Sequence, residues 1–301
     1  MHKKSQHFSH TASAKCLLFG AHAVLRGKDA LACSLTNYTL TLQWSSYPHE
    51  LNITGIHCKK LQKLFLSFLS HACTLCQISA DNLKGKLHLQ TNIPIGSNLG
   101  SSAAICIAIS KLFVHLQYIE ANEEHVFSKQ CENFFHGLSS GLDILASNCP
   151  KKEILLWENN IPKTQKIIWK PTLYLLATPS QANTREAITK VTQWSQQNPV
   201  LAKKVDEDMH HCTHQAYQAM AQTNLSSYTR HQKFQQAVLQ AYQCYKTWGL
   251  IPKKTEAIIQ KQYQLGALAI TPVGGGDGGH ILIHAPSNNL AYQKNPDVIA
   301  I

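Results

Sequence analysis

A glycine- and serine-rich turn followed by small side chains constrains this chain more than any other segment. It spans residues 94–104 and reads PIGSNLGSSAA. Glycine lets the backbone turn tightly and approach a ligand without a Cβ clash, and we expect Ser101 or Ser102 to cap a helix that starts there. The first N–H groups and the positive end of the helix dipole would then face the turn, which predicts an anion-binding site.

Spacing alone does not separate this prediction from a plain turn with a capped helix. The sequence has no G-x-x-x-x-G-K-[ST], which excludes a P-loop site. A second glycine run, residues 274–279, formally matches G-x-G-x-x-G. A dinucleotide-binding fingerprint needs a helix after the glycines, and the strand-like His280 to His284 follows instead, so we do not expect a Rossmann site.

Length and composition limit the classes of protein. The chain has 301 residues, enough for two domains of about 100–200 residues each. Its 44% hydrophobic content excludes wholesale disorder, and its longest apolar stretches, Ala103 to Ile109 and Leu173 to Ala177, are too short to span a membrane. The net charge of +11 attracts anions. Because the basic residues are scattered, we expect an anionic small molecule and not nucleic acid.

Ten cysteines follow an N-terminal stretch that has no apolar signal-peptide core. This predicts a reducing, cytoplasmic location in which the cysteines are thiols. Two groups have zinc-like spacing: Cys73 with Cys76, and the run His210, His211, Cys212 and His214. We expect neither to bind zinc, because a single C-x-x-C is a weak signal and histidines are common on polar helix faces.

Hydrophobic periodicity predicts an α+β chain. Helices are expected over residues 59–73, 101–119 and 123–135 and through much of 184–266, and strands over 36–44, 86–90, 172–178, 267–271 and 280–285, with a polar break at 159–166. The strands are not evenly interleaved with the helices, which favours two α+β domains over one α/β sheet. We place the boundary near residue 170, giving domains 1–170 and 171–301.

Four segments, taken together and in order, resemble the motifs of the GHMP kinase family. They are residues 13–27, the turn at 94–104, Ser139 to Asp143, and residues 271–279 (TPVGGGDGG). Asn98 stands where the family most often has glycine. The resemblance implies the two-domain GHMP kinase fold, with an N-terminal domain like ribosomal protein S5 domain 2, a ferredoxin-like C-terminal domain, and the active site between them.

Glu132 and Asp143 form a candidate carboxylate pair, one on a predicted helix and one on the loop after it. Kinase chemistry needs one carboxylate for the metal and another near the substrate hydroxyl. Taken alone, Glu132 is interpreted as a solvated helix residue. The spacing through His136 and Gly137 to Asp143 resembles that of the mevalonate kinases within the family, which implies that Glu132 and Ser102 bind Mg²⁺ and that Asp143 is the catalytic base.

The same resemblance implies the remaining site residues. ATP would lie against Pro94, Gly96, Asn98, Leu99, Gly100, Ser101, Ser102 and Ala103. Lys15 would act in catalysis, because its cation lowers the pKa of a substrate hydroxyl and keeps Asp143 ionised. Substrate contacts would come from Lys15, Asp143, His22, Thr184, Arg185, Gly275 and Gly276. For Thr184 and its neighbour Asn183, an N-capped helix start is the alternative role, and both can hold together.

The implied activity is that of an ATP- and Mg²⁺-dependent alcohol phosphotransferase. Its reaction would be phosphorylation of the primary hydroxyl of mevalonate, a step of isoprenoid precursor synthesis. Asp277 resembles a residue of phosphomevalonate kinases and keeps that activity open, and diphosphomevalonate decarboxylase is a weaker alternative. Ala21 replaces a motif glutamate, which keeps a non-catalytic binding protein open. We expect a small hydroxy acid as partner and neither nucleic acid nor membrane, and a homodimer stays open.

Overall fold

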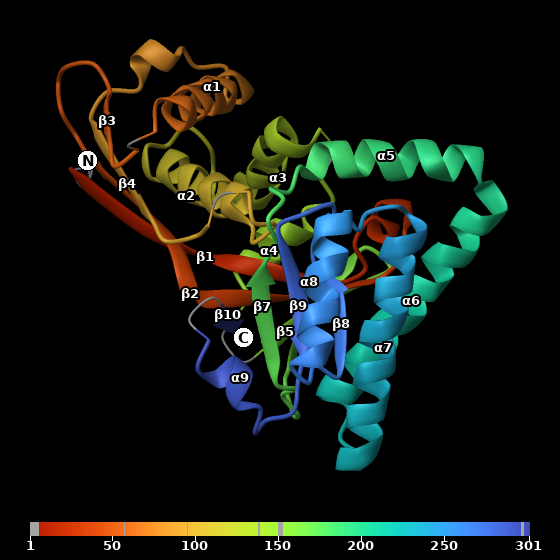
Figure 1. Cartoon of the computed structure of the whole chain (residues 1–301). Helices are drawn as coiled ribbons and strands as arrows, with labels where there is room; N and C mark the ends of the chain where they lie inside the picture. The colour runs from red at the N-terminus through yellow and green to blue at the C-terminus, as the bar shows by residue number, and fades with distance from the viewer. Residues whose placement is uncertain (1–5, 57, 95, 138, 150–152, 296–297) are drawn as a thin grey trace. The chain divides into compact units, whose positions relative to one another are not determined.

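The computed structural model describes residues 6–56, 58–94, 96–137, 139–149, 153–295 and 298–301. Helices and strands are mixed, as the α+β prediction requires (Figure 1). The chain packs into two compact units: unit 1 comprises Met1–Ala14, Leu35–Ile93 and Gly100–Asn148, and unit 2 comprises Lys15–Ser34, Pro94–Leu99 and Cys149–Ile301. Each unit is built from three separate segments of the chain. The single domain boundary near residue 170 stays a prediction.

Two long strands, β1 (His7–Phe19) and β2 (Ala30–Ser45), pair with each other and contribute residues to both units. In unit 1 the end of β2 pairs antiparallel with β4 (Lys86–Thr91), which pairs parallel with β3 (Asn52–Thr54). Leu40, Leu42 and Trp44 are buried and alternate with more exposed residues, so their side chains share one face of the sheet.

Helices α1 (Lys59–Leu75), α2 (Ser101–His115), α3 (Glu124–His136) and α4 (Leu142–Ser147) complete unit 1 with the short turns η2 (Ala80–Asn82) and η3 (Ala121–Glu123). Helix α3 packs against α1, α2 and α4. Phe113 of α2 and Phe127 of α3, for example, have ring centroids 5.6 Å apart. This packing brings the start of α2, the end of α3 and the start of α4 together in unit 1.

In unit 2, the first residues of β2 pair with a different strand. Ala30–Ala32 pair antiparallel with β5 (Glu153–Glu158), which pairs with β6 (Ile161–Lys166). The predicted polar break at 159–166 is therefore wrong. Asn159 and Asn160 both adopt positive φ, which suits a tight hairpin turn. Every residue of β6 is exposed, so the strand lacks the apolar alternation by which sequence reveals strands.

A four-stranded antiparallel sheet forms the second part of unit 2, in the order β10 (Val298–Ala300), β7 (Leu173–Ala177), β9 (His280–His284) and β8 (Ala269–Pro272). On one face, Ile281 and Ile283 join an apolar cluster with Ile259 of α8 (Lys253–Gln264) and Tyr292 of α9 (Leu290–Gln293). On the other face, His284 packs against Phe234, with ring centroids 5.2 Å apart. Both faces of this sheet are therefore covered.

The predicted helical region after residue 184 consists of α5 (Thr184–Gln197), α6 (Pro199–Ala221), α7 (Ser227–Thr247) and α8. The breaks between these helices fall at Asn198, at residues 222–226 and at residues 248–252. Figure 1 shows α6 and α7 as two long helices lying side by side, and they pack on each other. A short helical turn, η1 (Ala23–Arg26), contacts α6. Across the described ranges, every helix is too short or too polar to cross a bilayer.

Phe234 of α7 provides a test of the core of unit 2. Its side chain is fully buried and packs edge-on against Phe19, with ring centroids 5.9 Å apart. Phe234→Ala is expected to lower the free energy of unfolding by about 3–5 kcal/mol, because it leaves a cavity. Tyr228→Ala on the same helix, at a side chain that is 74% exposed, is expected to change it by less than about 0.5 kcal/mol. Urea denaturation measures both, and equal losses would contradict this packing.

Candidate active site

Helix α2 begins at an unusual N-terminus. Its N-cap is Gly100, which has φ 80° in the left-handed region and bears no capping side chain. The prediction that Ser101 or Ser102 caps the helix is therefore wrong, because both serines already lie in the first helical turn. Glycine adopts this conformation at no steric cost. A glycine cap leaves the first N–H groups of the helix without a side-chain acceptor, which suits an anion.

Ser102 connects this N-terminus to the end of α3. Its Oγ lies 3.0 Å from Nε2 of His136, the last residue of that helix. The sequence places His136 within a motif but predicts no role for it. The contact shows that the predicted metal ligand Ser102 and the C-terminus of α3 meet in unit 1.

Glu132 is only 1% exposed, although it carries a carboxylate. The Ser139 hydroxyl donates to its Oε2, and Ser139 Oγ also accepts a hydrogen bond of 3.0 Å from the N–H of Gly141. The N–H of Ser139 in turn donates to Oδ1 of Asn133 at 2.8 Å. Ser139 and Gly141, just before α4, are therefore held near the Glu132 carboxylate. The sequence predicts no role for Ser139, although this residue begins the serine–glycine motif at Ser139 to Asp143.

Asp143 lies in the first turn of α4. The prediction that it lies on a loop is therefore wrong. The helix starts at Gly141, whose φ is 86°. Glu132, His136 and Asp143 each offer a ligand atom, and these three atoms lie within 4.8 Å of one another. The structure therefore brings the two predicted carboxylates together. Their separate roles remain predictions.

The donors in this cluster fit a magnesium ion. Mg²⁺ prefers oxygen ligands, commonly one or two carboxylates with phosphate oxygens and water. Glu132 and Asp143 supply carboxylate oxygens, and Ser102 supplies a hydroxyl. A buried carboxylate is costly unless positive charge or hydrogen bonds compensate it, and Glu132 is such a group. We therefore find the chemistry of the site compatible with Mg²⁺.

In unit 2, the turn before α2 is ordered by hydrogen bonds. The N–H of Lys15, on β1, donates to the carbonyl of Leu99 at 2.9 Å, and Lys15 is 3% exposed. Within the turn, the Ser97 hydroxyl donates to the carbonyl of Pro94 and accepts from the N–H of Leu99. Nδ1 of His280 donates to the Ser97 carbonyl at 2.9 Å. The predicted catalytic lysine is thus adjacent, through its backbone, to the predicted ATP-binding turn.

Asn98 links three predicted parts of the site. Its φ of 63° is tolerated by asparagine better than by most residues, which explains how it replaces the usual glycine. Its Oδ1 accepts a hydrogen bond of 3.3 Å from the Thr184 hydroxyl. Its Nδ2 lies 3.4 Å from the carbonyl of Gly276. In unit 2, the side chain therefore joins the turn to the start of α5 and to the second glycine run.

The second glycine run, residues 274–279, lies between β8 and β9, which confirms the predicted strand–loop–strand arrangement. Gly276 has φ 66°, and a Cβ there would lie 2.8 Å from Cδ1 of Tyr245. The Tyr245 hydroxyl donates to the carbonyl of Gly274 at 2.6 Å. The carboxylate of Asp277 lies 3.7 Å from Nζ of Lys190 on α5. Tyr245 thus supports the loop. Asp277, the residue that resembles phosphomevalonate kinases, has Lys190 as its partner.

His22 is a buried, neutral side chain. Burial lowers its pKa from 6.5 to about 4. Its Nε2 donates to the carbonyl of Gly275 at 2.8 Å, and its ring meets Trp248 edge-on at 5.4 Å. With Nε2 protonated, Nδ1 is a hydrogen-bond acceptor at neutral pH. The predicted contact from His22 would thus be a hydrogen bond accepted from a hydroxyl, and not an ion pair with an acid.

The start of α5 contains the other two predicted substrate residues. Asn183 is the N-cap, and its Oδ1 accepts from the N–H of Glu186 at 3.3 Å. Thr184 and Arg185 are the first residues of the helix, and Arg185 is exposed. The structural alternative for this stretch, a capped helix start, is therefore correct for Asn183. Thr184 in addition contacts Asn98, as described above.

The sequence is similar to those of known kinases. Residues 64–150 match the family model described as "GHMP kinases N terminal domain". The mevalonate kinase of Pyrococcus furiosus is 24% identical over 303 residues, covering 92% of this chain and 89% of that protein. The mevalonate kinase of Dictyostelium discoideum is 26% identical over 262 residues, covering 65% of each chain. The predicted resemblance is confirmed.

Solved structures agree on the fold. A crystal structure of L. major mevalonate kinase in complex with R-mevalonate has a TM-score of 0.76 and 19% identity, and covers 100% of this chain and 98% of that chain. The Streptococcus pneumoniae phosphomevalonate kinase structure has a TM-score of 0.63 and 12% identity, and covers 98% of this chain and 100% of that chain. At these identities the likeness shows the fold, and the predicted fold class is confirmed.

The buried state of His22 predicts a pH dependence of stability. Its pKa is about 4 in the folded protein and 6.5 without burial, so the unfolded chain takes up the proton first as the pH falls. The contribution of the neutral imidazole is complete above pH 6.5 and is lost as the pH falls toward 4, by about 3 kcal/mol. His22→Gln keeps a donor for Gly275 and should remove this part of the slope.

Denaturant unfolding at several pH values between 7 and 4 measures the effect. His284 shifts in the same direction, because burial and His231 lower its pKa to about 4, so the variant should keep part of the acid sensitivity. Parallel stability curves for wild type and His22→Gln would show that His22 is not buried as a neutral group.

Proposed function

We propose that this chain, a member of the GHMP kinase family, transfers the γ-phosphoryl group of ATP to the primary hydroxyl of mevalonate. The observation that carries the proposal is the cluster in unit 1. Two carboxylates, Glu132 and Asp143, converge there, and Ser102 at the N-terminus of α2 bonds to the third member of the cluster, His136. An anion site next to paired acids is what phosphoryl transfer needs.

Asp143 is the proposed catalytic base. The substrate oxygen would attack the γ-phosphorus, the bond from that phosphorus to the β,γ-bridging oxygen would break, and the hydroxyl proton would pass to the Asp143 carboxylate. ADP is then the leaving group. The position of Asp143 at the start of α4, beside Glu132, supports this role. Proton transfer by a positioned carboxylate contributes about 10²–10⁴-fold to a rate.

Glu132 and Ser102 are the proposed holders of Mg²⁺. The ion, when bound, neutralises charge on the phosphate oxygens. Glu132 keeps its orientation because Ser139 donates to Oε2, and Ser102 keeps its orientation through His136. The N–H groups in the first turn of α2 would bind phosphate oxygens, with the turn residues Pro94, Gly96, Asn98, Leu99, Gly100, Ser101 and Ala103 around the nucleotide.

The substrate contacts are proposed from unit 2. Lys15 would lower the pKa of the substrate hydroxyl, and neutral His22 would accept a hydrogen bond from a hydroxyl. Thr184 is held by Asn98, next to the loop that contains Gly275 and Gly276. Arg185 is suited to a carboxylate, because its planar guanidinium pairs with one through two hydrogen bonds. The hydroxy acid mevalonate has such a carboxylate.

The relatives support the choice of substrate. The alignment with the Pyrococcus furiosus mevalonate kinase covers most of both proteins. The similar L. major structure is a complex with R-mevalonate. We also propose a cytoplasmic location, which the ten cysteines, expected to be thiols, support. We keep a homodimer as a prediction of oligomeric state.

The role of Asp143 is tested by Asp143→Asn. Turnover is expected to fall by about 10²–10⁴-fold, because the amide cannot accept the proton, while ATP affinity changes little. Asp81→Asn is the matched control, at an exposed acid of the same unit. Steady-state kinetics and nucleotide titration measure the two quantities. Near wild-type turnover for Asp143→Asn would remove this residue from the mechanism.

Glu132→Gln tests the metal role separately. It should raise the Mg²⁺ concentration needed for half-maximal activity, because a neutral amide is a weaker ligand than a carboxylate. A magnesium titration of activity at saturating ATP measures this. An unchanged midpoint with lower maximal activity would mean that Glu132 acts on the fold or on another step.

The substrate is decided by an ADP-release assay with mevalonate, phosphomevalonate, homoserine and galactose. We expect mevalonate to give the highest kcat/KM. A higher value with phosphomevalonate would replace the proposed substrate, and no ADP release with any of the four would favour a non-catalytic binding protein.

A further inference from the structure

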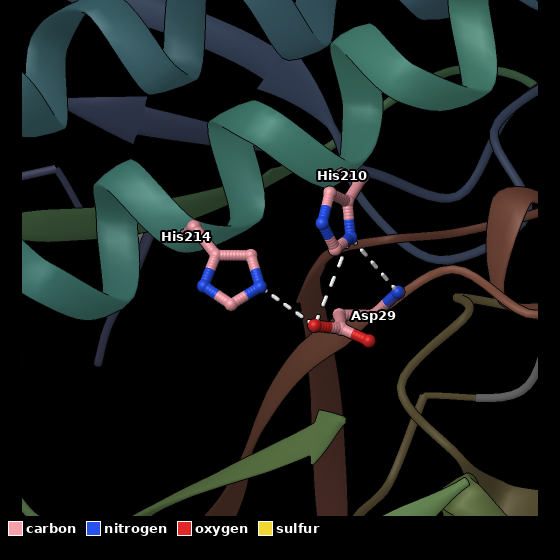
Figure 2. Close-up of side chains that lie close together, drawn as sticks. All are labelled: Asp29, His210 and His214. Atoms are coloured by element: carbon pink, nitrogen blue, oxygen red, sulfur yellow. Dashed lines mark hydrogen bonds and ion pairs between the residues drawn. The ribbon is translucent and has the colours of Figure 1, made fainter. Parts of the chain in front are cut away.

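A second cluster of metal-ligating side chains lies in unit 2 and has no part in the proposed catalysis. It consists of Asp29, which precedes β2, and of His210 and His214 on α6. The two histidines are four residues apart, so they share one face of the helix. Figure 2 shows both imidazoles directed toward the Asp29 carboxylate. The sequence alone argues against zinc at these histidines. The structure reverses that expectation, because it brings them a third donor, Asp29, which is far away along the chain.

The donor atoms are close enough for one ion. Oδ2 of Asp29 lies 2.6 Å from Nε2 of His214 and 3.7 Å from Nδ1 of His210. All three donors lie within 4.8 Å of one another. Zinc binds imidazole nitrogen and carboxylate oxygen at about 2.0–2.2 Å, so tetrahedral ligands are separated by roughly 3.3 Å. The two measured separations lie on either side of that value, and small side-chain rotations would equalise them.

Burial and orientation also favour a bound cation. The side chain of Asp29 is 4% exposed, whereas those of His210 and His214 are 36% and 28% exposed. A buried carboxylate needs a compensating positive charge or hydrogen bonds, and the partly exposed imidazoles leave an approach for the ion and for water. The other carboxylate oxygen, Oδ1, accepts the N–H of Asn159 at 3.2 Å. This bond orients the carboxylate and leaves Oδ2 to the histidines.

We propose that Asp29, His210 and His214 bind one Zn²⁺ ion, with water as the fourth ligand. Two imidazoles and a carboxylate are a ligand set typical of zinc. Helix α6 also contacts the residues just before Asp29 through ion pairs. Arg26 makes two hydrogen bonds to Asp206, and Lys28 pairs with Glu207. The ion would fasten α6 to the start of β2 and stabilise unit 2. It would take no part in phosphoryl transfer.

Co²⁺ titration of the full-length protein, purified without a histidine tag, tests the proposal. Tetrahedral Co²⁺ absorbs visible light, and the lack of thiolate charge-transfer absorption would exclude the cysteines as ligands. Wild type should bind one Co²⁺ more than His210→Gln or His214→Gln, because each variant lacks one of three ligands and should bind more than about 100-fold more weakly. His211→Gln, at an exposed neighbour on the same helix, is the matched control and should behave as wild type.

Two further features keep the result unambiguous. The Glu132 cluster can also take up Co²⁺, and His210→Gln and His214→Gln measure that background because they leave it intact. Zn²⁺ should raise the melting temperature of wild type and His211→Gln, and should raise that of His210→Gln and His214→Gln less. Equal Co²⁺ uptake and equal Zn²⁺ shifts in all four proteins would overturn the site, and would leave the proposed kinase function untouched.

Discussion

A buried carboxylate, Glu132, is the constraint on which the candidate active site of unit 1 depends. Removing a carboxylate from water costs several kcal/mol unless charge or hydrogen bonds compensate it. The structure places Glu132 on α3 and holds Ser139 against it. The same serine accepts the N–H of Gly141, which is the N-cap of α4. The position of Asp143 therefore follows from the hydrogen bonds that Glu132 requires.

In unit 2, three neutral side chains bond to the backbone carbonyls of Ser97, Gly274 and Gly275. His22, His280 and Tyr245 each donate to the carbonyl of a turn or glycine residue. Burial lowers the pKa of both histidines, so these bonds are made without placing charge in the interior. A loop held in this way can lie close to an anionic ligand, because it adds no negative side chain of its own at those positions. The charged pairs of unit 2 that involve Arg26 and Lys28 lie instead on α6.

The sequence predicted most helices and buried strands, because their apolar periodicity is strong. It missed β6, which is exposed throughout, and α4, which has only six residues. It also missed β1 and β5, although the second half of β1 and most of β5 are buried, because a short continuous apolar run does not by itself distinguish a strand. Among the site residues, the turn and the two acids were predictable because they form short local motifs. His136 and Ser139 act through hydrogen bonds that only the packing of α2, α3 and α4 creates. Asp29 could not be assigned to the histidines, since nothing local connects it with α6.

The central claim is that α2 and the Glu132 cluster bind the nucleotide and its metal. A crystal structure with Mg²⁺ and a non-hydrolysable ATP analogue tests it most directly. The account predicts phosphate oxygens within hydrogen-bond distance of the first N–H groups of α2, and Mg²⁺ about 2.1 Å from an oxygen of Glu132. A nucleotide bound elsewhere on the chain, with Glu132 remote from the metal, would contradict it.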